Sequence, residues 1–578
     1  MLKTLKAYIG EFKKTAMTAP VFIILEVILE MVIPLLMAEI IDNGLGAGNM
    51  GYVVKIGLIM LLVSFSSLVC GAMAGKQAAT ASTGFARNLR EAMYNHIQEF
   101  SFSNIDRYST AGLVTRLTTD VTNVQNAFQM ILRMLVRAPM MLLVAMTMAF
   151  SINARLSMVF LVALVFLGIV IFFLMGRVGP YFKEMLDKYD GLNASVQENL
   201  TGIRVVKAYV REDHETQKFK KASEILYRCS IRAEKLMVSM MPIMQVCVYS
   251  CIIALSWLGA KTIVVGGMTT GQLMSMFTYT MNILMSLMMI AAVTVMLSMA
   301  KSSGERICEV LAEESSLTNG PEPKMAVENG AISFEDVCFS YQGDPENLHL
   351  SHVNLEIASG ETVGILGGTG SAKSTLVQLI PRLYDVTSGS VRVADVDVRD
   401  YDLETLRNEV SMVLQKNVLF SGTIKENLRW GNPEASDEEI KRVCKLACAD
   451  EFIERFPERY DTRIEQGGSN VSGGQKQRLC IARALLKKPK ILILDDSTSA
   501  VDTHTDAMIR KAFREEIPDT TKIIIAQRIS SVQEADKIVV LNDGKIDAIG
   551  THEELLASNR IYQEVYNSQQ KGGDADEQ

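Results

Sequence analysis

A glycine-rich stretch, GGTGSAKST, has the composition of a loop that binds phosphate groups. It follows an apolar run, TVGIL, that is typical of a β-strand. Backbone N–H groups in such a turn wrap a phosphate chain, and the N-terminus of the following helix adds favourable polarity. Lys373 would reach the terminal phosphates, and the Ser374 hydroxyl would bind Mg²⁺. The predicted phosphate-binding residues are Gly367, Gly368, Thr369, Gly370, Ser371, Ala372, Lys373, Ser374 and Thr375.

Two adjacent carboxylates follow another apolar run, in the stretch ILILDDSTSAVD. An aspartate at the end of a buried strand can hold Mg²⁺ through water, as in P-loop NTPases, which assigns Asp495 to the metal. In isolation this stretch could be a core strand before a helix cap, since Asp and Ser are good N-caps, and the glycine-rich stretch could be a tight turn without a ligand. Their presence in one chain favours a site for ATP and Mg²⁺. The second carboxylate, on Asp496, needs a separate explanation.

Between these two stretches lies NVSGGQKQR, at residues 470–478, which resembles the signature motif of the ATPase domains of ABC transporters. Other motifs of that family are also present, before and after this one, and they occur along the chain in the family's order. Tyr341, in FSY, stands where the family has the aromatic residue that stacks on adenine. Gln415 matches the glutamine that contacts Mg²⁺ and faces the membrane domain, and Ser499 to Asp502 resemble the D-loop.

The resemblance covers nearly the whole chain and implies a half-transporter of the exporter type, which works as one of a pair. In the family, two ATP molecules lie between the nucleotide domains, each bound by the lysine loop of one domain and the signature of the other. A serine hydroxyl and two glycine N–H groups can close on a γ-phosphate only across such an interface. The residues expected to act on the partner's ATP are Ser472, Gly473, Gly474 and Gln475, with Asp502 in the D-loop.

Three residues depart from the family's pattern, and all lie on the half that binds this chain's own ATP. Asp496 stands where the family has the glutamate that orients or deprotonates the attacking water, and its shorter side chain displaces the carboxylate by about 1 Å. Gln527 replaces a histidine and cannot carry the charge of an imidazolium beside the γ-phosphate. Ala372 replaces a glycine, and its methyl group is compatible with binding if the residue is already helical but otherwise crowds the phosphate.

The signature, by contrast, differs from the family's only by an apolar exchange at Val471. A homodimer would hold the defective water-positioning groups in both sites, so we expect a heterodimer in which this chain retains ATP, hydrolyses it poorly and completes the partner's site. The chain thus resembles the degenerate member of heterodimeric bacterial multidrug exporters. Two alternatives remain open. In one, these substitutions are tolerated in an active homodimeric exporter of lipids or peptides; in the other, the chain is an ATP-binding regulatory or channel subunit.

The elements before residue 300 must supply the membrane part, because the chain of 578 residues is 48% hydrophobic and its apolar windows are concentrated there. Each window can cross a bilayer core of about 30 Å, which needs about 20 residues. The six windows are 20–41, 52–75, 133–152, 157–178, 236–262 and 272–298. Lys and Arg gather in the N-terminal arm and in the linkers 76–132 and 179–235, which predicts a multi-pass plasma-membrane protein with both termini in the cytoplasm. We expect a bacterial source.

Apolar residues at helical spacing continue through the two long linkers, so we expect spans 2 to 5 to extend as helices well beyond the bilayer. A transmembrane domain is predicted over 1–315, a linker over 316–330, an ATP-binding domain over 331–567 and a disordered acidic tail over 568–578. Alternating β-type runs and helical patterns indicate a mainly parallel sheet. The fold class is therefore a polytopic, all-α six-helix transmembrane domain followed by an α/β P-loop nucleotide-binding domain of the ABC type.

The predicted cargo is a hydrophobic or amphipathic small molecule, and the net charge of −7 gives no support for nucleic acid as a partner. Glu26 and Glu30 lie four residues apart in the first apolar window, where carboxylates are costly and usually face a cavity or a partner. They could bind a cationic amphiphile, pair with a basic residue of the partner chain, or lie shallow enough to be solvated. Met281 and Met285 suit a surface that adapts to varied ligands, although simple lipid or helix contact explains them equally well.

Overall fold

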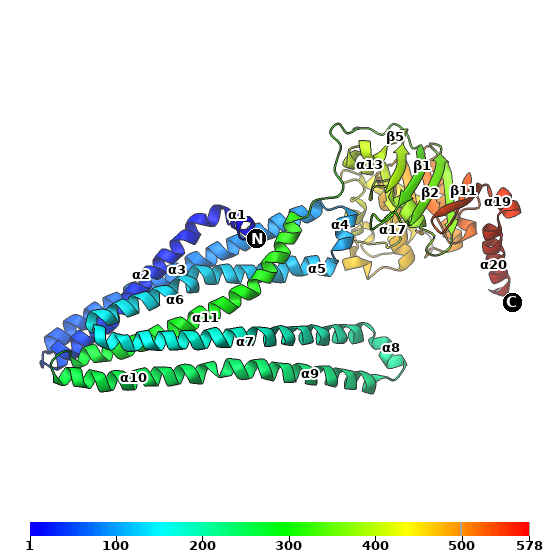
Figure 1. The fold of residues 1–578 in the computed structure, drawn as a ribbon. Coiled ribbons are helices and arrows are strands. Elements are labelled where there is room, and N and C mark those ends of the chain that lie inside the picture. The colour runs from blue at the N-terminus through cyan, green and yellow to red at the C-terminus, as the bar shows by residue number, and fades with distance from the viewer. Residues whose placement is uncertain (498–499, 577–578) are drawn as a thin grey trace. The chain divides into compact units, whose positions relative to one another are not determined.

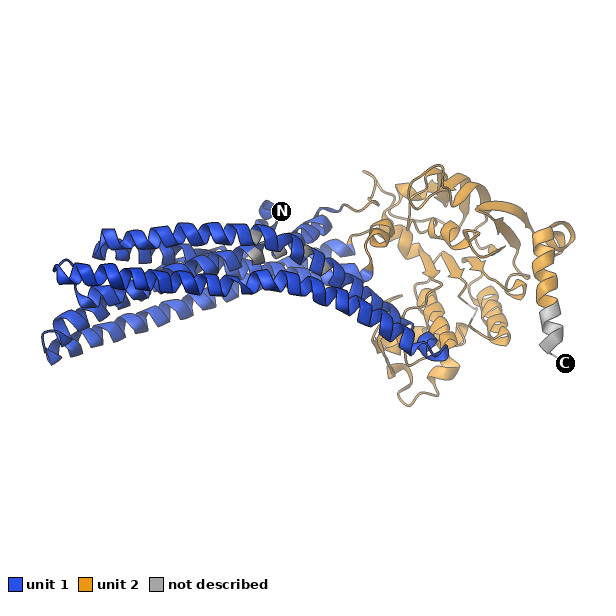
Figure 2. Ribbon diagram, turned by 60° about the horizontal axis from the view of Figure 1, so that its bottom comes forward, with its two compact units in different colours: residues 1–98, 110–313 blue, residues 99–109, 314–578 orange. Residues whose placement is uncertain are grey.

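The computed structural model describes residues 1–497 and 500–576, and it divides into two compact units. Unit 1 comprises residues 1–98 and 110–313, and unit 2 comprises residues 99–109 and 314–578 (Figure 2). Unit 1 is entirely helical, whereas unit 2 contains all the strands. The described part of the chain therefore has one helical unit and one α/β unit, as the sequence predicts.

Unit 1 consists of long helices joined by short turns (Figure 1). In chain order its elements are α1 (Leu2–Ala7), η1 (Gly10–Phe12), α2 (Lys13–Glu39), η2 (Ile40–Leu45), α3 (Met50–Gln98), α5 (Thr110–Thr115), η3 (Arg116–Asp120), α6 (Val121–Ile152), α7 (Ala154–Thr201), α8 (Ile203–Ala208), α9 (Glu212–Val238), α10 (Met240–Val264) and α11 (Thr270–Ala312). Figure 1 shows α7 running beside α9 and α10 as a long hairpin that α8 closes.

Six helical segments in the described residues are long and apolar enough to cross a membrane; five contain a predicted window whole, and the sixth, Thr270–Thr294, contains most of the window 272–298. Several are much longer than a bilayer needs: α3 has 49 residues and α7 has 48. At 1.5 Å per residue such helices extend far past a 30 Å hydrocarbon core. The expected helical extensions beyond the apolar windows are thus confirmed.

The core of unit 1 forms where the apolar stripe of α2 meets α11. Ile23, Val27 and Met31 of α2 recur every four residues and are almost completely buried. Two polar groups of α11 are buried among them, and each donates a hydrogen bond to a backbone oxygen of α2: Tyr279 Oη to Met31 O at 2.8 Å and Ser275 Oγ to Pro34 O at 2.6 Å. The buried hydroxyls are therefore satisfied, as an apolar environment requires.

Unit 2 alternates strands and helices. Its helices are α4 (Phe102–Arg107), α12 (Lys373–Gln378), α13 (Leu403–Glu409), α14 (Ile424–Leu428), α15 (Asp437–Leu446), α16 (Asp450–Ile453), α17 (Gly473–Leu486), α18 (Thr503–Glu516), α19 (His552–Ser558) and α20 (Arg560–Asp576), with the short turns η4 (Val398–Asp400), η5 (Arg459–Asp461), η6 (Gln466–Gly468) and η7 (Ile529–Ser531). Its strands are β1 (Ile332–Phe339), β2 (Leu350–Ile357), β3 (Thr362–Gly367), β4 (Ser388–Val393), β5 (Val396–Asp397), β6 (Val410–Val413), β7 (Gly422–Thr423), β8 (Arg463–Ile464), β9 (Ile491–Asp495), β10 (Thr521–Ile525), β11 (Lys537–Asn542) and β12 (Lys545–Gly550).

The main sheet has the strand order β12-β11-β3-β10-β9-β6, and every pair is parallel except β11 with β12. A second, antiparallel sheet has the order β2-β1-β4-β5. The apolar runs TVGIL and ILIL form β3 and β9, and both strands are neighbours of β10 in the centre of the sheet. Central parallel strands are covered on both faces, which explains their unbroken aliphatic runs.

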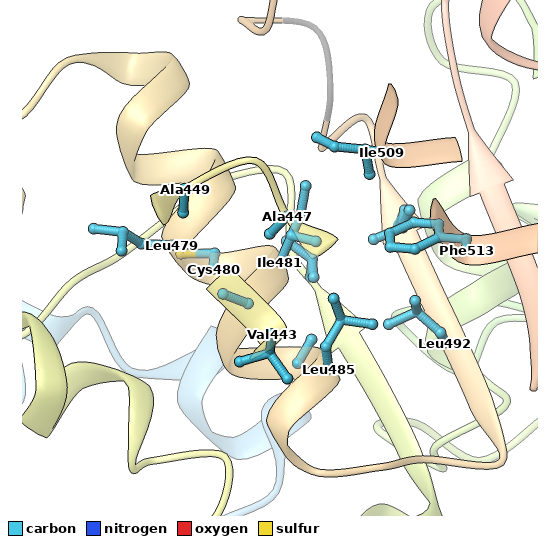
Figure 3. Packing of buried hydrophobic residues seen from close by; sticks show 14 of the residues in the cluster. Val443, Ala447, Ala449, Leu479, Cys480, Ile481, Leu485, Leu492, Ile509 and Phe513 are labelled. Atoms are coloured by element: carbon cyan, nitrogen blue, oxygen red, sulfur yellow. The ribbon is translucent and has the colours of Figure 1, made fainter. Parts of the chain in front are cut away.

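One face of the main sheet is covered by α17, which packs between α15, α18 and the strands (Figure 3). Ile481 and Leu485 of α17 lie four residues apart on one face of the helix, and both are buried. Figure 3 shows Leu485 near Leu492 of β9, while Phe513 of α18 covers the same strand from the side. This packing fixes the helix that follows the signature motif relative to the strand that carries Asp495.

Residues 99–109, which contain α4, pack with unit 2 although they lie in the sequence between two helices of unit 1. Tyr384 of unit 2 donates a hydrogen bond to Asp106 of α4, with an Oη to Oδ2 distance of 2.5 Å. The ring of Tyr384 also meets Phe102 edge-on, at 6.1 Å between centroids. The predicted boundary at residue 315 therefore misses this excursion, because a six-residue helix in a longer helical pattern carries no sequence signal of its own.

The C-terminal segment also differs from expectation, since α20 extends to Asp576 through residues for which the sequence predicts a disordered tail. Side-chain contacts hold the helix at least as far as residue 569: Tyr562 Oη lies 2.6 Å from His552 Nδ1, and Gln569 forms hydrogen bonds with the loop after β10. Such tertiary contacts stabilise a helix whose polar composition alone would not.

Candidate nucleotide site

The glycine-rich loop joins β3 to α12, in the middle of the parallel sheet. The carboxyl ends of parallel strands are the usual place for a ligand in such folds. A cavity of about 790 Å³ opens here. Its lining consists of the whole loop Gly367 to Thr375 together with Leu348, His349, Leu366, Gln415, Asp495, Asp496, Ile525, Gln527, Asp543, Gly544 and Val565. The structure thus brings together the glycine-rich loop, Asp495, Asp496, Gln415 and Gln527.

Lys373, the first residue of α12, folds over the loop. Its Nζ donates hydrogen bonds to Gly367 O at 2.8 Å and Gly368 O at 2.7 Å. Burial lowers the pKa of Lys373, and the charges of Asp495 and Asp496 oppose that shift. A half-buried ammonium group bound only to neutral oxygens is well placed to exchange them for phosphate oxygens.

Ala372 has a left-handed backbone conformation, with φ +68° and ψ +26°. The residue is therefore not helical. The condition under which its methyl group is compatible with phosphate binding is not met. L-residues other than glycine pay about 1–2 kcal/mol in this region, because Cβ approaches a carbonyl oxygen. Ala372 is thus strained, and the residue belongs to the lining of the phosphate cavity.

Asp495 ends β9 opposite Ile525 of β10, and it faces the start of α12. Ser374 Oγ donates a hydrogen bond to Asp495 Oδ1 at 2.9 Å. Burial raises the pKa of Asp495, and the hydrogen bond from Ser374 partly offsets the shift. A hydroxyl and a carboxylate in contact, with room for water and phosphate oxygens, are the donor set that Mg²⁺ prefers. The residues therefore fit Mg²⁺, which would be held by Ser374, Asp495 and Gln415 and would neutralise charge on the phosphate oxygens.

Asp496 also has a left-handed backbone, with φ +48°, and its N–H donates to Ile525 O at 3.0 Å. Its Oδ2 accepts a hydrogen bond from Gln527 Nε2 at 2.8 Å. Burial raises the pKa of Asp496, whereas the amides of Gln527 and Gln415 lower it. Two of the three residues that depart from the family pattern, Asp496 and Gln527, thus contact each other, which the sequence did not reveal. Their pairing directs the Asp496 carboxylate toward a neutral amide.

Tyr341 lies beside the cavity rather than in its lining. Its Oη is 3.0 Å from Thr375 Oγ1, and its ring meets that of His349 edge-on at 4.9 Å between centroids. Burial raises the pKa of Tyr341, so the phenol remains neutral. The ring therefore stands next to two lining residues, where a flat base could stack on it.

The signature lies at the start of α17. Ser472 is the N-cap, and it forms a capping box with Gln475, so the backbone N–H groups of Ser472 and Gln475 are satisfied. A side chain at Gly474 would place its Cβ 2.8 Å from Ala500 O, which explains the glycine there. Within the described residues, the lining of the cavity does not include Ser472 to Gln475. The chain alone therefore does not bring its signature to its own phosphate loop.

Asp502 of the proposed D-loop is the N-cap of α18, and its Oδ1 accepts a hydrogen bond from Thr505 N at 2.9 Å. Ser499, at the other end of that motif, lies outside the described residues. Seven lining residues were not predicted: Leu348, His349, Leu366, Ile525, Asp543, Gly544 and Val565. The Asp-Gly pair is a recognisable turn signal, whereas His349 and Val565 belong to no motif.

Glu26 and Glu30, the two carboxylates in the first apolar window, have a partner that the sequence did not suggest. Arg137 of α6 binds Glu26 Oε1 at 2.5 Å and Glu30 Oε2 at 2.6 Å, so both carboxylates pair within the same chain. Gly71 of α3 makes room for Glu26, since a Cβ there would lie 2.9 Å from Glu26 Oε1. The cluster of Glu26, Glu30 and Arg137, here called the charged triad, therefore carries one net negative charge.

Met281 and Met285 of α11 lie on an exposed part of the helix surface in the single chain, with 48% and 54% of their surface accessible. They are separated by four residues and so share one face. That face is available for lipid, for a second chain or for cargo.

Comparisons with known proteins agree with this architecture. Residues 17–288 match the family described as ABC transporter transmembrane region, and residues 350–499 match the family described as ABC transporter. An uncharacterized ABC transporter ATP-binding protein of Bacillus subtilis is 36% identical over 567 residues, which cover 97% of this chain and 98% of the relative. The ATP-dependent lipid A-core flippase of Desulfotalea psychrophila is 33% identical over 488 residues, or 84% of each chain.

A solved structure of a bacterial Atm1-family ABC exporter with ATP bound superposes with a TM-score of 0.83. The match covers 96% of this chain and 99% of that one at 23% identity, so it establishes the fold. One family match lies mainly in unit 1 and the other in unit 2, and the Bacillus subtilis relative aligns over nearly the full length of the chain. The chain belongs to the ABC transporters, as a half-transporter of the exporter type that joins a six-helix transmembrane region to an ATP-binding domain.

Proposed function

We propose that this exporter chain is one subunit of a heterodimer in the plasma membrane, with both termini in the cytoplasm. It retains ATP and Mg²⁺ at its own site, hydrolyses the nucleotide poorly and supplies its signature to the partner's competent site. The observation that carries the proposal is the hydrogen bond between Asp496 and Gln527, which occupy the positions of the family's glutamate and histidine.

The physical argument concerns the attacking water. A carboxylate on the shorter Asp496 side chain starts about 1 Å farther from the γ-phosphate than a glutamate would, and the 2.8 Å bond to Gln527 directs it sideways. A displacement of about 1 Å costs on the order of 10² in rate. Gln527 is neutral and stabilises no developing negative charge. The phosphate loop, however, keeps Lys373 and Ser374, so binding outlasts hydrolysis.

The signature supports the second half of the proposal. Ser472 keeps its capping box, and the glycines at 473 and 474 leave the first turn of α17 open to a phosphate. A helix N-terminus with free N–H groups favours an anion. This surface has no role at the chain's own loop, since it does not line the cavity in the described structure. It can therefore serve the nucleotide of a partner.

The test is steady-state ATP hydrolysis by the purified full-length chain in lipid nanodiscs, alone and after co-expression with a half-transporter encoded beside it. We expect turnover only in the mixed sample, and we expect it to disappear when the partner's glutamate is changed to glutamine. Full activity of the chain alone would refute the heterodimer and support a homodimeric exporter. Ion current that depends on ATP, without accumulation of any solute, would support a channel instead.

The charged triad supports a narrower cargo class within this proposal. One net negative charge in an apolar segment favours an amphiphile with a cationic or zwitterionic group over an anionic one. Glu30 is the more exposed carboxylate, with 37% of its side chain accessible, against 19% for Glu26. Glu30→Gln should therefore reduce export of a cationic dye by the heterodimer while leaving a neutral dye unaffected. Glu39→Gln, at the end of the same helix, is the matched control, and equal loss for both dyes would contradict the assignment.

A further inference from the structure

The C-terminal helix α20 meets the nucleotide site through two residues, one in the lining of the cavity and one at the loop beside it. Val565 is part of the cavity lining. Gln569 lies four residues later, hence on the same face of the helix, and it contacts the loop that follows β10. One face of α20 thus closes the side of the site where Gln527 stands.

Gln569 uses both ends of its amide on this loop. Its Oε1 accepts a hydrogen bond from Ile529 N at 2.9 Å, and its Nε2 donates one to Gln527 O at 2.7 Å. The two bonds flank a single residue and so fix the backbone on both sides of it. Since Gln527 reaches Asp496 with its side chain, the orientation of that side chain depends on this backbone being held.

The helix that carries Gln569 is itself firmly placed. Tyr562, one of the most deeply buried side chains, contacts His552 Nδ1 through its hydroxyl and receives a cap from Asn559 Oδ1 on its N–H at 2.8 Å. Asn559 Nδ2 in turn donates to Asp547 Oδ2 of β12 at 2.6 Å. A rigid anchor at the base of α20 means that Gln569 holds the loop rather than following it.

We propose that Gln569 is a positioning residue of the ATP site: through the backbone of the loop after β10 it sets where Gln527 meets the γ-phosphate. The inference rests on the proposed function, in which this chain binds ATP at its own site. ADP lacks the γ-phosphate and cannot report the position of Gln527. A positioning role therefore affects the preference for ATP over ADP, whereas general loosening of the domain weakens both nucleotides alike.

The experiment measures equilibrium affinity of the full-length chain in nanodiscs for two probes with Mg²⁺, the β,γ-imido analogue of ATP and ADP. Gln569→Met keeps the length and packing of the side chain but removes both hydrogen bonds. Loss of one or two such bonds lowers affinity for the ATP analogue about threefold to tenfold, and affinity for ADP remains that of the wild type.

Gln570→Met is the matched control, because the adjacent glutamine donates to Tyr566 Oη of its own helix. Gln569→Glu retains the acceptor for Ile529 N–H but loses the donor, so it should give an intermediate ratio. An unchanged ratio in Gln569→Met, or equal loss for both probes, would overturn this inference while the proposed function stands. A wild-type chain that binds neither probe would overturn the proposed function and this inference together.

Discussion

The cavity side of the ATP-binding unit and its signature side have diverged in opposite directions. On the cavity side, Ala372 and Asp496 both hold left-handed backbones without being glycine, and the side chain of Asp496 is bound by Gln527. On the signature side, Ser472 retains a complete capping box, and Gly474 stands where any side chain would meet a backbone oxygen. In the proposed function, the first of these faces binds ATP and the second completes another chain's site.

The difference teaches that hydrolysis and binding depend on different groups in this fold. Binding needs backbone N–H groups, a lysine and a metal, which the loop at 367–375 and Asp495 can supply. Hydrolysis needs one carboxylate within a fraction of an ångström of its productive position. Loss of hydrolysis leaves nucleotide binding intact, so a chain can become a nucleotide-holding subunit through substitutions at a few positions.

The largest effect is expected from restoring the cavity side. In the heterodimer with the partner's own site inactivated, Asp496→Glu combined with Gln527→His should raise ATP turnover by about 10², because the carboxylate regains its reach. Phosphate release in nanodiscs measures it. Each single substitution is the control and should give much less, since the two residues contact each other. No gain in the double variant would place the lesion elsewhere.

A smaller effect is expected from breaking the signature side. Ser472→Ala removes a hydrogen bond to the partner's charged γ-phosphate, and such a bond is worth about 1.5 kcal/mol or more, so hydrolysis in the heterodimer should fall about tenfold. The substitution also removes a helix cap. Ser436→Ala removes the corresponding capping box of α15, a helix that carries none of the nucleotide-binding motifs. This variant therefore controls for the loss of the cap. Equal effects of the two variants on turnover would contradict the signature role.

Relief of the backbone strain at Ala372 should change ATP affinity by about threefold at most. Ala372→Gly relieves about 1 kcal/mol of left-handed strain and removes a methyl group from the phosphate loop, so both the melting temperature and ATP affinity should rise. Ala394 also has a positive φ, of +48°, in the turn between β4 and β5. Ala394→Gly should therefore raise the melting temperature alone. If both variants leave ATP affinity unchanged, the methyl group does not crowd the phosphate.

The smallest effect concerns α4 and its hydrogen bond from Tyr384. Tyr384→Phe keeps the ring contacts and removes about 1 kcal/mol from the docking of residues 99–109, which should increase amide hydrogen exchange in that segment severalfold. Tyr401→Phe is the control, because its hydroxyl donates to Val393 O inside the same domain. Faster exchange throughout the unit in both variants would mean general destabilisation instead.

Much of the fold follows from the sequence because its signals are local. The aliphatic runs at β3, β9 and β10 and the six apolar windows each depend on residues close together in the chain, and all are present in the structure. The gathering of the loop, Asp495, Asp496, Gln415 and Gln527 around one cavity follows from the parallel order of strands.

The features that escaped prediction depend on side chains distant in sequence or on backbone angles. Arg137 lies more than a hundred residues from Glu26, and nothing in either segment marks them as partners. The left-handed conformation of Ala372 is set by the loop around it, since alanine alone disfavours it. Gln569 belongs to a polar segment whose helix is stabilised by tertiary contacts, so composition indicated disorder.

The placement of residues 99–109 in the ATP-binding unit has a practical consequence for anyone dissecting the protein. The polypeptide passes between the two units three times, after residues 98, 109 and 313. A protease that cuts only the linker near residue 320 would therefore leave the two units joined by the two connections after residues 98 and 109. A recombinant fragment that begins at residue 331 would lack α4, and the phenol of Tyr384 would meet water in place of Asp106.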